Sequence, residues 1–517
     1  MIFAIEIRKP YLWIPVKKQG EKKLLTIAAD QEKITEVMVP IANKDSCDFY
    51  ATIGVRDYQG KTLLFDGIEE ESFYQGIRQE ESRYETQQVN RPEIHFTANT
   101  GWINDPNGLV YQDGVYHLYF QYNPFDVEWD NMSWGHAVSK DLLHWTQLDT
   151  VMWPDEEGMM FSGSGIRNER KLLNLPEAAL LFYYSAAGGT TPWSKEKLFT
   201  QRLAYSLDHG KTLKKEKTFV VPTIEKENRD PKVFWHEESK AYIMVLWLKD
   251  HEFAILRSTN LTEFTISQRL ILEDAFECPD LFPLSVEGER EKKWVFWCAD
   301  GFYYVGDFDG FTFTLEQGKR CGYQTHLPYA AQTIAGVIDR MISIPWLRAK
   351  FLDRPYTGAM GIPRELGLLS IRGAWYLQQP YCQEYRDARR KRKKIQLTSE
   401  NTIQIGTVTG VTEIEVSSDT ELSGRINILL GDQCLHMDFD KKQIQYKEDT
   451  VFLHEEIPLK DFSLLIDETI IELTAQNATI YIVYELPEQP LTGKIELQSV
   501  QGTHERNINI YELEKEK

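Results

Sequence analysis

Three acidic residues in unusual sequence contexts are the first candidates for chemistry. They are Asp105, Asp230 and Glu277, which lie in the segments HFTANTGWINDPNGLVY (95–111), NRDPKVFWH (228–236) and AFECPDLFP (275–283). Hydrolysis of a glycosidic bond needs two carboxyl groups, one that protonates the leaving oxygen and one that attacks or activates water. A third carboxylate could stabilise the oxocarbenium-like transition state. The three residues therefore indicate glycoside hydrolysis, provided that the fold brings them together.

Each of the three also has a simpler interpretation. Turn chemistry alone explains Asp105, because the residue before a proline is extended and the following Asn-Gly pair closes a hairpin. Arg229 and Asp230 could form a surface ion pair, since neighbouring residues of a strand point to opposite faces. Glu277 could end a strand beside a chance cysteine, although its apolar neighbours would favour the protonated carboxyl that a general acid needs.

Aromatic residues surround the first of these segments. Trp102 lies shortly before Asp105, and Gln121, Trp129 and Trp134 follow within the next thirty residues. Indole rings offer flat apolar walls for a sugar ring, and polar side chains between them offer hydrogen bonds. This setting favours a sugar site over an isolated turn.

The elements that must position these residues are β-strands. Short β-rich runs bounded by Gly, Pro, Asn and Asp fill the chain and helical periodicity is rare, which predicts an all-β protein. Between residues 90 and 385 a phrase recurs in which a strand ends in a small polar residue and a short turn leads to a second strand. The four instances are AVSKDLLHWTQL (137–148), AYSLDHGKTLKKE (204–216), LRSTNLTEFTIS (256–267) and VGDFDGFTFTLE (305–316).

The spacing of this phrase predicts a β-propeller. Counted from the end of each first strand, the intervals are 67, 52 and 48 residues. Four-stranded blades repeat about every 40–50 residues, and insertions lengthen the interval. The alternative is a large β-sandwich in which the phrase recurs by chance. On a propeller the three carboxylates could fall on the innermost strands of successive blades, which all line one central funnel.

Two further β-rich regions flank the predicted propeller. Residues 1–85 alternate apolar and polar positions and indicate an N-terminal β-sandwich-like domain, which a polar linker at 77–93 follows. The propeller is expected over 86–385. The basic run RDARRKRKK (386–394) is interpreted as a solvated surface segment rather than a nucleic-acid patch, given the acidic chain. A C-terminal β-sandwich is expected over 395–517.

An ordered set of eight motifs runs through the propeller region. They are WINDPNG, FQYNP, WGHAVSKDLLHW, FSGS, RDPKV, ECPDLF, YAAQT and PREL. As a set they resemble glycoside hydrolase family 32, which includes invertases, inulinases and levanases, strongly over about residues 93–385 and weakly over 395–517. The resemblance implies a five-bladed β-propeller followed by a β-sandwich. Residues 1–85 resemble, by pattern only, the accessory β-sandwich that precedes the propeller in some bacterial fructan hydrolases.

The resemblance also implies a role for each carboxylate. Asp105 would be the nucleophile, Asp230 the transition-state stabiliser and Glu277 the general acid/base. Eight further residues would surround the terminal fructosyl unit: Asn104, Gln121, Trp129, Phe161, Ser162, Arg229, Tyr329 and Trp346. This machinery needs neither a metal nor an organic cofactor.

Two positions depart from the family pattern. The family usually has an Asp shortly before the YAAQT motif, where this chain reads THLPYAAQT. The change would either alter the pocket floor or remove a surface charge. The family typically has a Trp-Met pair where this chain has Trp346 and Leu347.

Composition limits the partners. With 58 Lys and Arg against 78 Asp and Glu, the formal net charge of −20 repels phosphate backbones and anionic lipids, so neither nucleic acid nor a membrane is expected. No apolar run approaches the roughly 18 residues of a spanning helix. The six cysteines are far apart and form no CxxC pair, which indicates reduced thiols. We therefore expect a cytoplasmic protein; its oligomeric state stays open.

The leading hypothesis is a retaining, exo-acting β-fructosidase that releases terminal fructose from levan- or inulin-type chains, fructo-oligosaccharides and sucrose. A cytoplasmic sucrose or sucrose-6-phosphate hydrolase is the first alternative, and the phosphate would need a basic residue at the funnel mouth. An endo-levanase would follow if the N-terminal domain extended the rim into a groove. A catalytically silent fructan-binding propeller would lack a carboxylate. Trp129, Phe161 and Trp346 would close a pocket around one sugar unit, which favours exo action.

Overall fold

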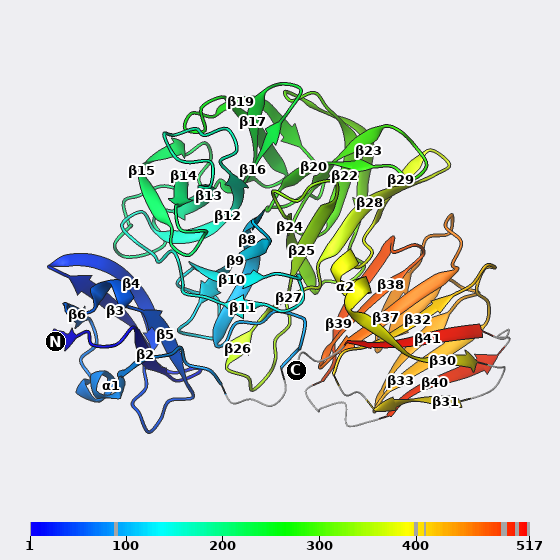
Figure 1. The fold of residues 1–517 in the computed structure, drawn as a ribbon, viewed down its shortest axis with the longest axis horizontal. Coiled ribbons are helices and arrows are strands. Elements are labelled where there is room, and N and C mark those ends of the chain that lie inside the picture. Colours follow the sequence, from blue (N-terminus) through cyan, green and yellow to red (C-terminus); the bar gives the residue numbers. More distant parts are fainter. Residues whose placement is uncertain are drawn as a thin grey trace.

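The computed structural model describes residues 2–86, 91–397, 402–407, 410–487, 494–501 and 506–513. Their strands form an N-terminal β-sandwich, a ring of five blades and a C-terminal β-sandwich, which lie in this order across the molecule (Figure 1). The predicted all-β fold with a five-bladed propeller is thus confirmed. Helical structure in these residues comprises α1 (Glu71–Gly76), α2 (Gln383–Ala388) and the 3-10 turn η1 (Arg56–Tyr58). None of the helices described is long and apolar enough to cross a membrane.

The N-terminal sandwich has two antiparallel sheets. In order across the first sheet, the strands are β1 (Phe3–Glu6), β6 (Thr62–Asp66), β3 (Lys22–Ala29) and β4 (Glu32–Pro40). Across the second sheet they are β5 (Phe49–Gly54), β2 (Tyr11–Val16) and β7 (Arg78–Glu80). Alternation along β3 buries Leu25, Ile27 and Ala29 between the sheets. The predicted linker at 77–93 contains β7, so its first part belongs to the sandwich, and residues 87–90 lie outside the described part.

The propeller blades each contain four antiparallel strands, ordered from the centre outward. Blade I contains β8 (Gly101–Gln112), β9 (Val115–Asn123), β10 (Ser133–Ser139) and β11 (Thr146–Gln147). Blade II contains β12 (Met159–Arg167), β13 (Leu180–Ala187), β14 (Thr200–Ser206) and β15 (Lys214–Val221). Blade III contains β16 (Arg229–His236), β17 (Ala241–Lys249), β18 (Glu252–Ser258) and β19 (Thr265–Ile271). Blade IV contains β20 (Asp280–Ser285), β21 (Lys292–Trp297), β22 (Phe302–Phe308) and β23 (Phe313–Cys321). Each repeated phrase of the sequence joins the third and fourth strands of one of these blades.

Blade V closes the ring. Its strands are β24 (Pro328–Thr333), β25 (Met341–Leu347), β28 (Arg364–Ile371) and β29 (Ala374–Gln378), with β27 (Ala359–Met360) against β25. The short strand β26 (Tyr356–Thr357) pairs in parallel with β8 of blade I. The first strand of blade II, β12, contacts both β8 of blade I and β16 of blade III, and β24 contacts β8. The last blade is therefore tied to the first, and the innermost strands surround one axis.

The C-terminal sandwich packs two six-stranded sheets. In order across the first sheet, the strands are β30 (Arg389–Leu397), β41 (Arg506–Leu513), β32 (Thr412–Ser417), β37 (Asp461–Asp467), β38 (Ile470–Ala475) and β39 (Ile480–Glu485). Across the second sheet they are β31 (Thr402–Thr407), β40 (Lys494–Gln501), β33 (Arg425–Leu430), β34 (Gln433–Asp438), β35 (Gln443–Tyr446) and β36 (Asp449–Phe452). The sandwich begins at Arg389 rather than at the predicted residue 395. The basic residues Arg390–Lys394 lie exposed on the edge strand β30, so their sequence shows no apolar alternation that would indicate a strand. Charged side chains are common on edge strands.

Candidate active site

One cavity of about 790 Å³ opens at the ends of the innermost propeller strands. The structure places all eleven residues singled out from the sequence on its walls: Asn104, Asp105, Gln121, Trp129, Phe161, Ser162, Arg229, Asp230, Glu277, Tyr329 and Trp346. Asp105 lies on β8 and Asp230 on β16. Glu277 differs from the expectation, because it lies in the turn just before β20 rather than on the strand. The chain thus brings together residues from all five blades.

Irregular strand pairing aims these side chains. The pairing register shifts between Ile103 and Pro106 on β8, between Phe161 and Gly163 on β12, and between Arg229 and Lys232 on β16. These bulges bracket Asp105, Ser162 and Asp230. A bulge re-aims a side chain that regular alternation would send elsewhere. This explains how the neighbours Arg229 and Asp230 both line the cavity, which a regular strand would not allow.

The backbone around two of the carboxylates is strained. Asp230 has a φ of 65°, and Glu277 and Cys278 have φ values of 27° and 45°, all in the left-handed region. Such conformations cost a residue with a side chain roughly 1–3 kcal/mol and persist where the surrounding structure over-determines them. Hydrogen bonds hold Asp230 in place: its N–H donates to Ser185 Oγ at 3.0 Å, and its Oδ2 accepts from the Cys278 N–H at 3.1 Å.

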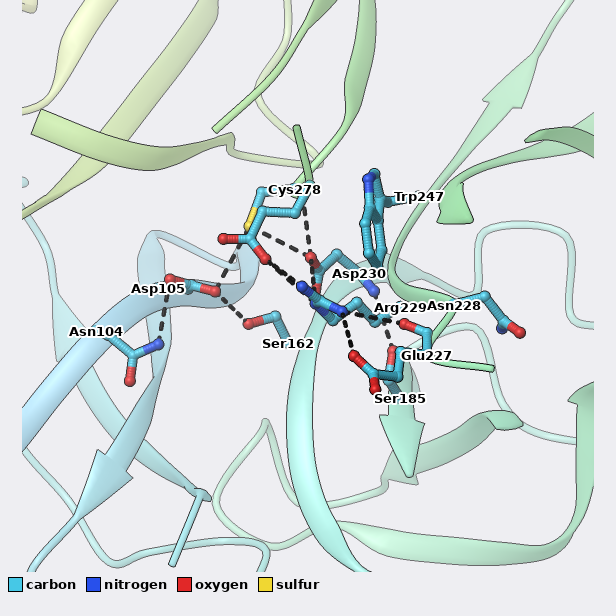
Figure 2. Close-up of polar contacts among 12 residues, drawn as sticks. Asn104, Asp105, Ser162, Ser185, Glu227, Asn228, Arg229, Asp230, Trp247 and Cys278 are labelled. Carbon is cyan, nitrogen blue, oxygen red and sulfur yellow. Dashed lines mark hydrogen bonds and ion pairs between the residues drawn. The ribbon is translucent and has the colours of Figure 1, made fainter. Parts of the chain in front are cut away.

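Asp105 is held by side chains on both oxygens (Figure 2). Ser162 Oγ donates to Asp105 Oδ2 at 2.6 Å, and Asn104 Nδ2 donates to Asp105 Oδ1 at 3.2 Å. The indole N–H of Trp102 donates to Asn104 Oδ1 at 2.9 Å, which fixes the amide with its NH₂ toward Asp105. The orientation of the carboxylate is therefore set before any substrate arrives.

Glu277 is held by a cation and a hydroxyl. Arg229 donates to Glu277 Oε2 from Nη2 at 2.7 Å and from Nε at 3.2 Å, and the Tyr329 hydroxyl donates to Glu277 Oε1 at 2.6 Å. The guanidinium of Arg229 lies 4.0 Å above the Trp247 ring, which orients it. The apolar setting expected from the sequence is thus wrong, because residues distant in sequence supply the polar partners.

Charge is poorly balanced in the cluster formed by Asp105, Asp230, Glu277 and Arg229. Burial, and next the nearby Glu277 carboxylate, raise the pKa of Asp105 above its ordinary value. Burial likewise raises the pKa of Asp230 to about 7, against the opposing effect of Arg229 and with Glu277 and Asp105 adding to the rise. Three carboxyl groups share one close guanidinium, so the site holds a proton more readily than isolated carboxylates would.

Cys278 connects two of the carboxylates. Its Sγ lies 3.5 Å from Oδ2 of both Asp105 and Asp230, and the ligand-type atoms of these three residues lie within 4.8 Å of one another. A metal ion could be held by this set only after the thiol lost its proton. Burial and then the charges of Asp105 and Asp230 raise the pKa of Cys278 well above its ordinary value. The arrangement therefore favours a neutral thiol, whose single proton can be donated to either Asp105 or Asp230.

Aromatic rings form the walls. Trp129, 49% exposed, meets Phe161 edge-on with 6.0 Å between ring centroids. Trp346 contacts the rings of Trp102 and Tyr329 at 5.8 and 6.2 Å. The indole N–H of Trp346 is buried and has no hydrogen-bond partner among the described residues. Trp129, Phe161, Tyr329 and Trp346 all line the cavity and give it flat apolar surfaces that suit a sugar ring.

Sequence reasoning missed several residues of the site. Cys278 contacts Asp105 and Asp230 without lining the cavity, and its place between Glu277 and a proline was a usable signal. Lys197, Lys226 and Arg348 line the cavity, and no local pattern marks them. Arg348 lies 3.6 Å above the ring of Tyr329.

The two departures from the family pattern lie away from the cavity walls. In the THLPYAAQT segment, none of residues 325–328, which directly precede Tyr329, lines the cavity. Leu347 is buried in the propeller core beside Trp346 and does not line the cavity either.

Comparison with known proteins gives consistent matches. The pattern of the Glycosyl hydrolases family 32 N-terminal domain matches residues 95–380. The chain is 35% identical over 323 residues to a levanase of Bacillus subtilis (strain 168), covering 56% of this chain and 46% of that protein. It is 33% identical over 347 residues to an extracellular exo-inulinase of Aspergillus niger, covering 56% of this chain and 64% of that protein. The chain thus matches less than two thirds of the length of these curated relatives.

A solved structure extends the likeness beyond the propeller. The exo-inulinase from Aspergillus awamori superimposes with a TM-score of 0.72 at 25% sequence identity, covering 84% of this chain and 100% of that chain. The matched family region contains Asp105, Asp230 and Glu277, and the likeness in fold includes the arrangement of propeller and sandwich. From the motif match over more than half of the chain and the cavity in which its carboxylates meet, we conclude that this chain belongs to glycosyl hydrolase family 32.

Proposed function

We propose that this protein is a retaining β-fructofuranosidase that removes terminal fructosyl units from fructans, fructo-oligosaccharides and sucrose. The observation that carries the proposal is the meeting of Asp105, Asp230 and Glu277 in one aromatic-walled cavity. The relatives named levanase and exo-inulinase support a fructoside as the substrate class. Membership of a glycosyl hydrolase family supports hydrolysis rather than silent binding, since all three carboxylates are present.

The proposed reaction has two displacements. Asp105 attacks the anomeric carbon of the fructosyl unit and forms an ester, while Glu277 gives its proton to the leaving oxygen. Water then attacks the ester, Glu277 takes the proton of the water, and Asp105 is released. Asp230 stabilises the positive charge that develops on the sugar ring. Two inversions at the same carbon retain its configuration.

The hydrogen bonds of the free site fit these roles. Ser162 and Asn104 orient Asp105 for attack. Tyr329 and Arg229 hold Glu277 at a fixed place. Asp230 must be ionised to stabilise a positive charge, and its pKa of about 7 places that ionisation near neutral pH. Activity should therefore follow a bell-shaped pH profile, because one carboxyl group must be ionised while another is protonated.

Exo action is favoured by the aromatic walls. Trp129 and Phe161 meet edge to face, Trp346 contacts Tyr329, and all four residues line the cavity. Walls of this kind surround one sugar unit, whereas a groove must spread its contacts over several units. We therefore propose release of single fructose units.

A second candidate substrate is a phosphorylated fructoside such as sucrose-6-phosphate. The basic residues Lys197, Lys226 and Arg348 all line the cavity and could bind a phosphate. Lys197 is paired with Glu157 at 3.1 Å and Lys226 with Glu227 at 3.5 Å, so a phosphate would have to compete with these carboxylates. We therefore rank the unphosphorylated fructosides first.

Product analysis tests the proposal. Purified protein would be incubated with sucrose, sucrose-6-phosphate, inulin and levan, and early products separated by chromatography and followed by NMR. Fructose should appear first from both polymers, as the β-anomer. An oligosaccharide ladder before fructose would contradict exo action, and α-fructofuranose as the first product would contradict retention. A clear preference for sucrose-6-phosphate would favour the second candidate.

A further inference from the structure

Two loops of the propeller form the outer wall of the cavity. The first rim loop, residues 124–132 between β9 and β10, contributes Trp129 and Met132 to the lining. The second rim loop, residues 188–199 between β13 and β14, contributes the stretches 188–190 and 197–199. Both loops leave the blades and reach toward the N-terminal sandwich, which lies beside blades I and II (Figure 1).

Strand β4 of the N-terminal sandwich holds the first rim loop. It is an edge strand of its sheet, so one side of its backbone can pair outside the sheet. The N–H of Met38 donates to Asn131 Oδ1 at 2.7 Å, and Asn131 Nδ2 donates to the carbonyl of Met38 at 2.8 Å. Asn131 is buried and thus acts as a short substitute for a pairing strand. Lys22 on the neighbouring strand adds an ion pair to the buried carboxylate of Asp126 at 2.9 Å.

The same strand also holds the second rim loop. Glu36, only 3% exposed, accepts a hydrogen bond from the N–H of Trp193 at 2.5 Å through Oε1. Its other oxygen pairs with Lys33 at 2.8 Å, and Lys33 Nζ lies 4.4 Å from the centre of the Trp193 ring. The loop is closed on itself by a bond of 2.8 Å from the N–H of Gly189 to the carbonyl of Ser194. Fixing Trp193 therefore fixes the part of the loop that lines the cavity.

We propose that the N-terminal sandwich is a positioning element of the active site, in which Glu36 and Asn131 hold the two rim loops as the outer wall of the substrate cavity. The inference rests on the proposed fructosidase function and adds a role for a domain remote from the chemistry. Neither Glu36 nor Asn131 lines the cavity, so both act through the loops that they hold. The domain thereby sets substrate affinity without taking part in bond cleavage.

The physical reason is the free energy of loop ordering. A loop that is already held loses little conformational entropy when substrate packs against it, whereas a free loop must be ordered at the expense of binding free energy. The catalytic carboxylates are held by other residues, on β8, β12, β13, β16 and β24. Releasing the rim loops should therefore weaken substrate binding and leave the chemical step unchanged, which raises KM at constant kcat.

Glu36→Ala tests the second rim loop. We expect KM for sucrose and inulin to rise roughly tenfold with kcat within about twofold, which corresponds to about 1.4 kcal/mol of lost binding free energy. Glu36→Gln keeps a carbonyl oxygen that can accept from the Trp193 N–H, so it should restore most of the affinity. Asn131→Gly tests the first rim loop independently: glycine tolerates the left-handed φ of 48° at this position, and both bonds to Met38 are removed.

Thr35→Val is the matched control. Thr35 lies on the same strand, is equally buried, and donates one hydrogen bond to the propeller, to the carbonyl of Pro154 at 2.8 Å. Pro154 does not line the cavity. This variant removes one contact between the same two domains but leaves the rim loops held. We expect KM to stay at the value of the unaltered protein.

Hydrogen exchange provides a measurement that does not depend on hydrolysis. Amides of residues 188–199 should exchange faster in Glu36→Ala, and those of 124–132 faster in Asn131→Gly, with neither change in Thr35→Val. The proposal is overturned if exchange and KM in both loop variants match those of the unaltered protein, or if Thr35→Val changes them equally. Absence of fructoside hydrolysis by the unaltered protein would refute the proposed function instead, and the exchange result would still decide whether the sandwich holds the loops.

Discussion

Two buried clusters of charged residues in this protein are built in opposite ways. The active-site cluster places Asp105, Asp230 and Glu277 near a single guanidinium, that of Arg229. The second cluster lies where the propeller meets the C-terminal sandwich and pairs its acidic residues, Asp467 and Glu472, with His95 and Arg364. The first cluster has an excess of negative charge, whereas the second is balanced.

The interface cluster satisfies nearly every polar group. Asp467 accepts from the N–H groups of Glu93, Ile94 and His95 at 2.7–3.0 Å, and Glu472 Oε1 accepts from the Tyr481 hydroxyl at 2.9 Å. Arg364, only 1% exposed, forms an ion pair with the other oxygen of Glu472. The resulting pKa values favour the charged forms: the pKa of His95 is raised to about 9 by its two carboxylate partners despite burial. That of Glu472 is lowered to about 2, chiefly by Arg364 acting against burial.

The comparison separates stability from catalysis. In the interface cluster, each carboxylate is paired with a cation and its charge state does not change near neutral pH. The cluster therefore joins two domains and takes no part in chemistry. In the active site, burial without enough cations raises the pKa values of Asp105 and Asp230, and the backbone of Asp230 and Glu277 is strained. The interface cluster has shifted pKa values too, but they favour the charged forms, whereas those of Asp105 and Asp230 favour the neutral forms. Backbone strain and carboxyl groups that hold a proton are typical of sites that transfer protons.

The largest effect is expected on turnover from the active-site cluster. Asp105→Asn and Glu277→Gln should each lower kcat by at least about a thousandfold, because an amide can neither attack the anomeric carbon nor transfer the proton. The unfolding temperature of each variant should equal or exceed that of the unaltered protein. Glu227→Gln, which removes a carboxylate at the edge of the same cavity, should have a far smaller effect. Near-normal hydrolysis by either of the first two variants would refute the assigned roles.

The largest loss of stability is expected from the interface cluster. Arg364→Met leaves the buried Glu472 carboxylate without its guanidinium, which should cost about 3–5 kcal/mol of unfolding free energy. Turnover per folded molecule should change little. Arg425→Met is the matched control, because Arg425 is half-exposed and its pair with Asp438 at 2.9 Å should contribute less than about 1 kcal/mol. Equal unfolding midpoints for the two variants would contradict the comparison.

The interface cluster should also give stability a defined alkaline limit. His95 has a folded pKa of about 9 against an ordinary value of 6.5, so its contribution is complete below about pH 6.5 and is lost as the pH rises through 9. Unfolding midpoints measured from pH 6 to 10 should fall across this window. In His95→Gln that fall should be absent, with a lower midpoint throughout. A parallel decline in both proteins would show that other groups set the alkaline limit.

The smallest effect is a gain of stability in the active site. Because the pKa of Asp230 is raised from 3.8 to about 7, its ionisation destabilises the folded protein progressively as the pH rises from about 4 to 7. Asp230→Asn should therefore stabilise the protein by roughly 1 kcal/mol at pH 8 and hardly at all at pH 4, while activity falls sharply. Unfolding curves at the two pH values measure the difference. A destabilised variant at pH 8 would mean that the cluster is held together by that charge.

Much of the fold could be predicted because its signals are local. The phrase that joins the third and fourth strands of a blade is a turn pattern, and it marked four of the five blades. Blade V lacks the phrase, since the residues between β28 and β29 form a tight turn of another type. The start of the C-terminal sandwich was missed because the basic residues of β30 conceal its strand pattern.

Those residues of the candidate site that lie in recognisable local motifs could also be predicted from the sequence. The motifs WINDPNG, RDPKV and ECPDLF identified Asp105, Asp230 and Glu277, and all three carboxylates line one cavity. The partners of these residues could not be predicted, because a hydrogen bond between residues such as Tyr329 and Glu277 depends on the meeting of two blades. The apolar setting assigned to Glu277 was wrong for this reason.

By itself, the sequence determined which residue types could do chemistry, the all-β class and the repeated blades, because each depends on neighbours within a few positions of the chain. Tertiary structure decided the rest. Strand bulges determine that both Arg229 and Asp230 face the cavity, and contacts across 372 residues of sequence bring His95 to Asp467. Glu36 reaches Trp193 from another domain. Contacts of this kind carry no local signal, since they form only when distant segments pack together.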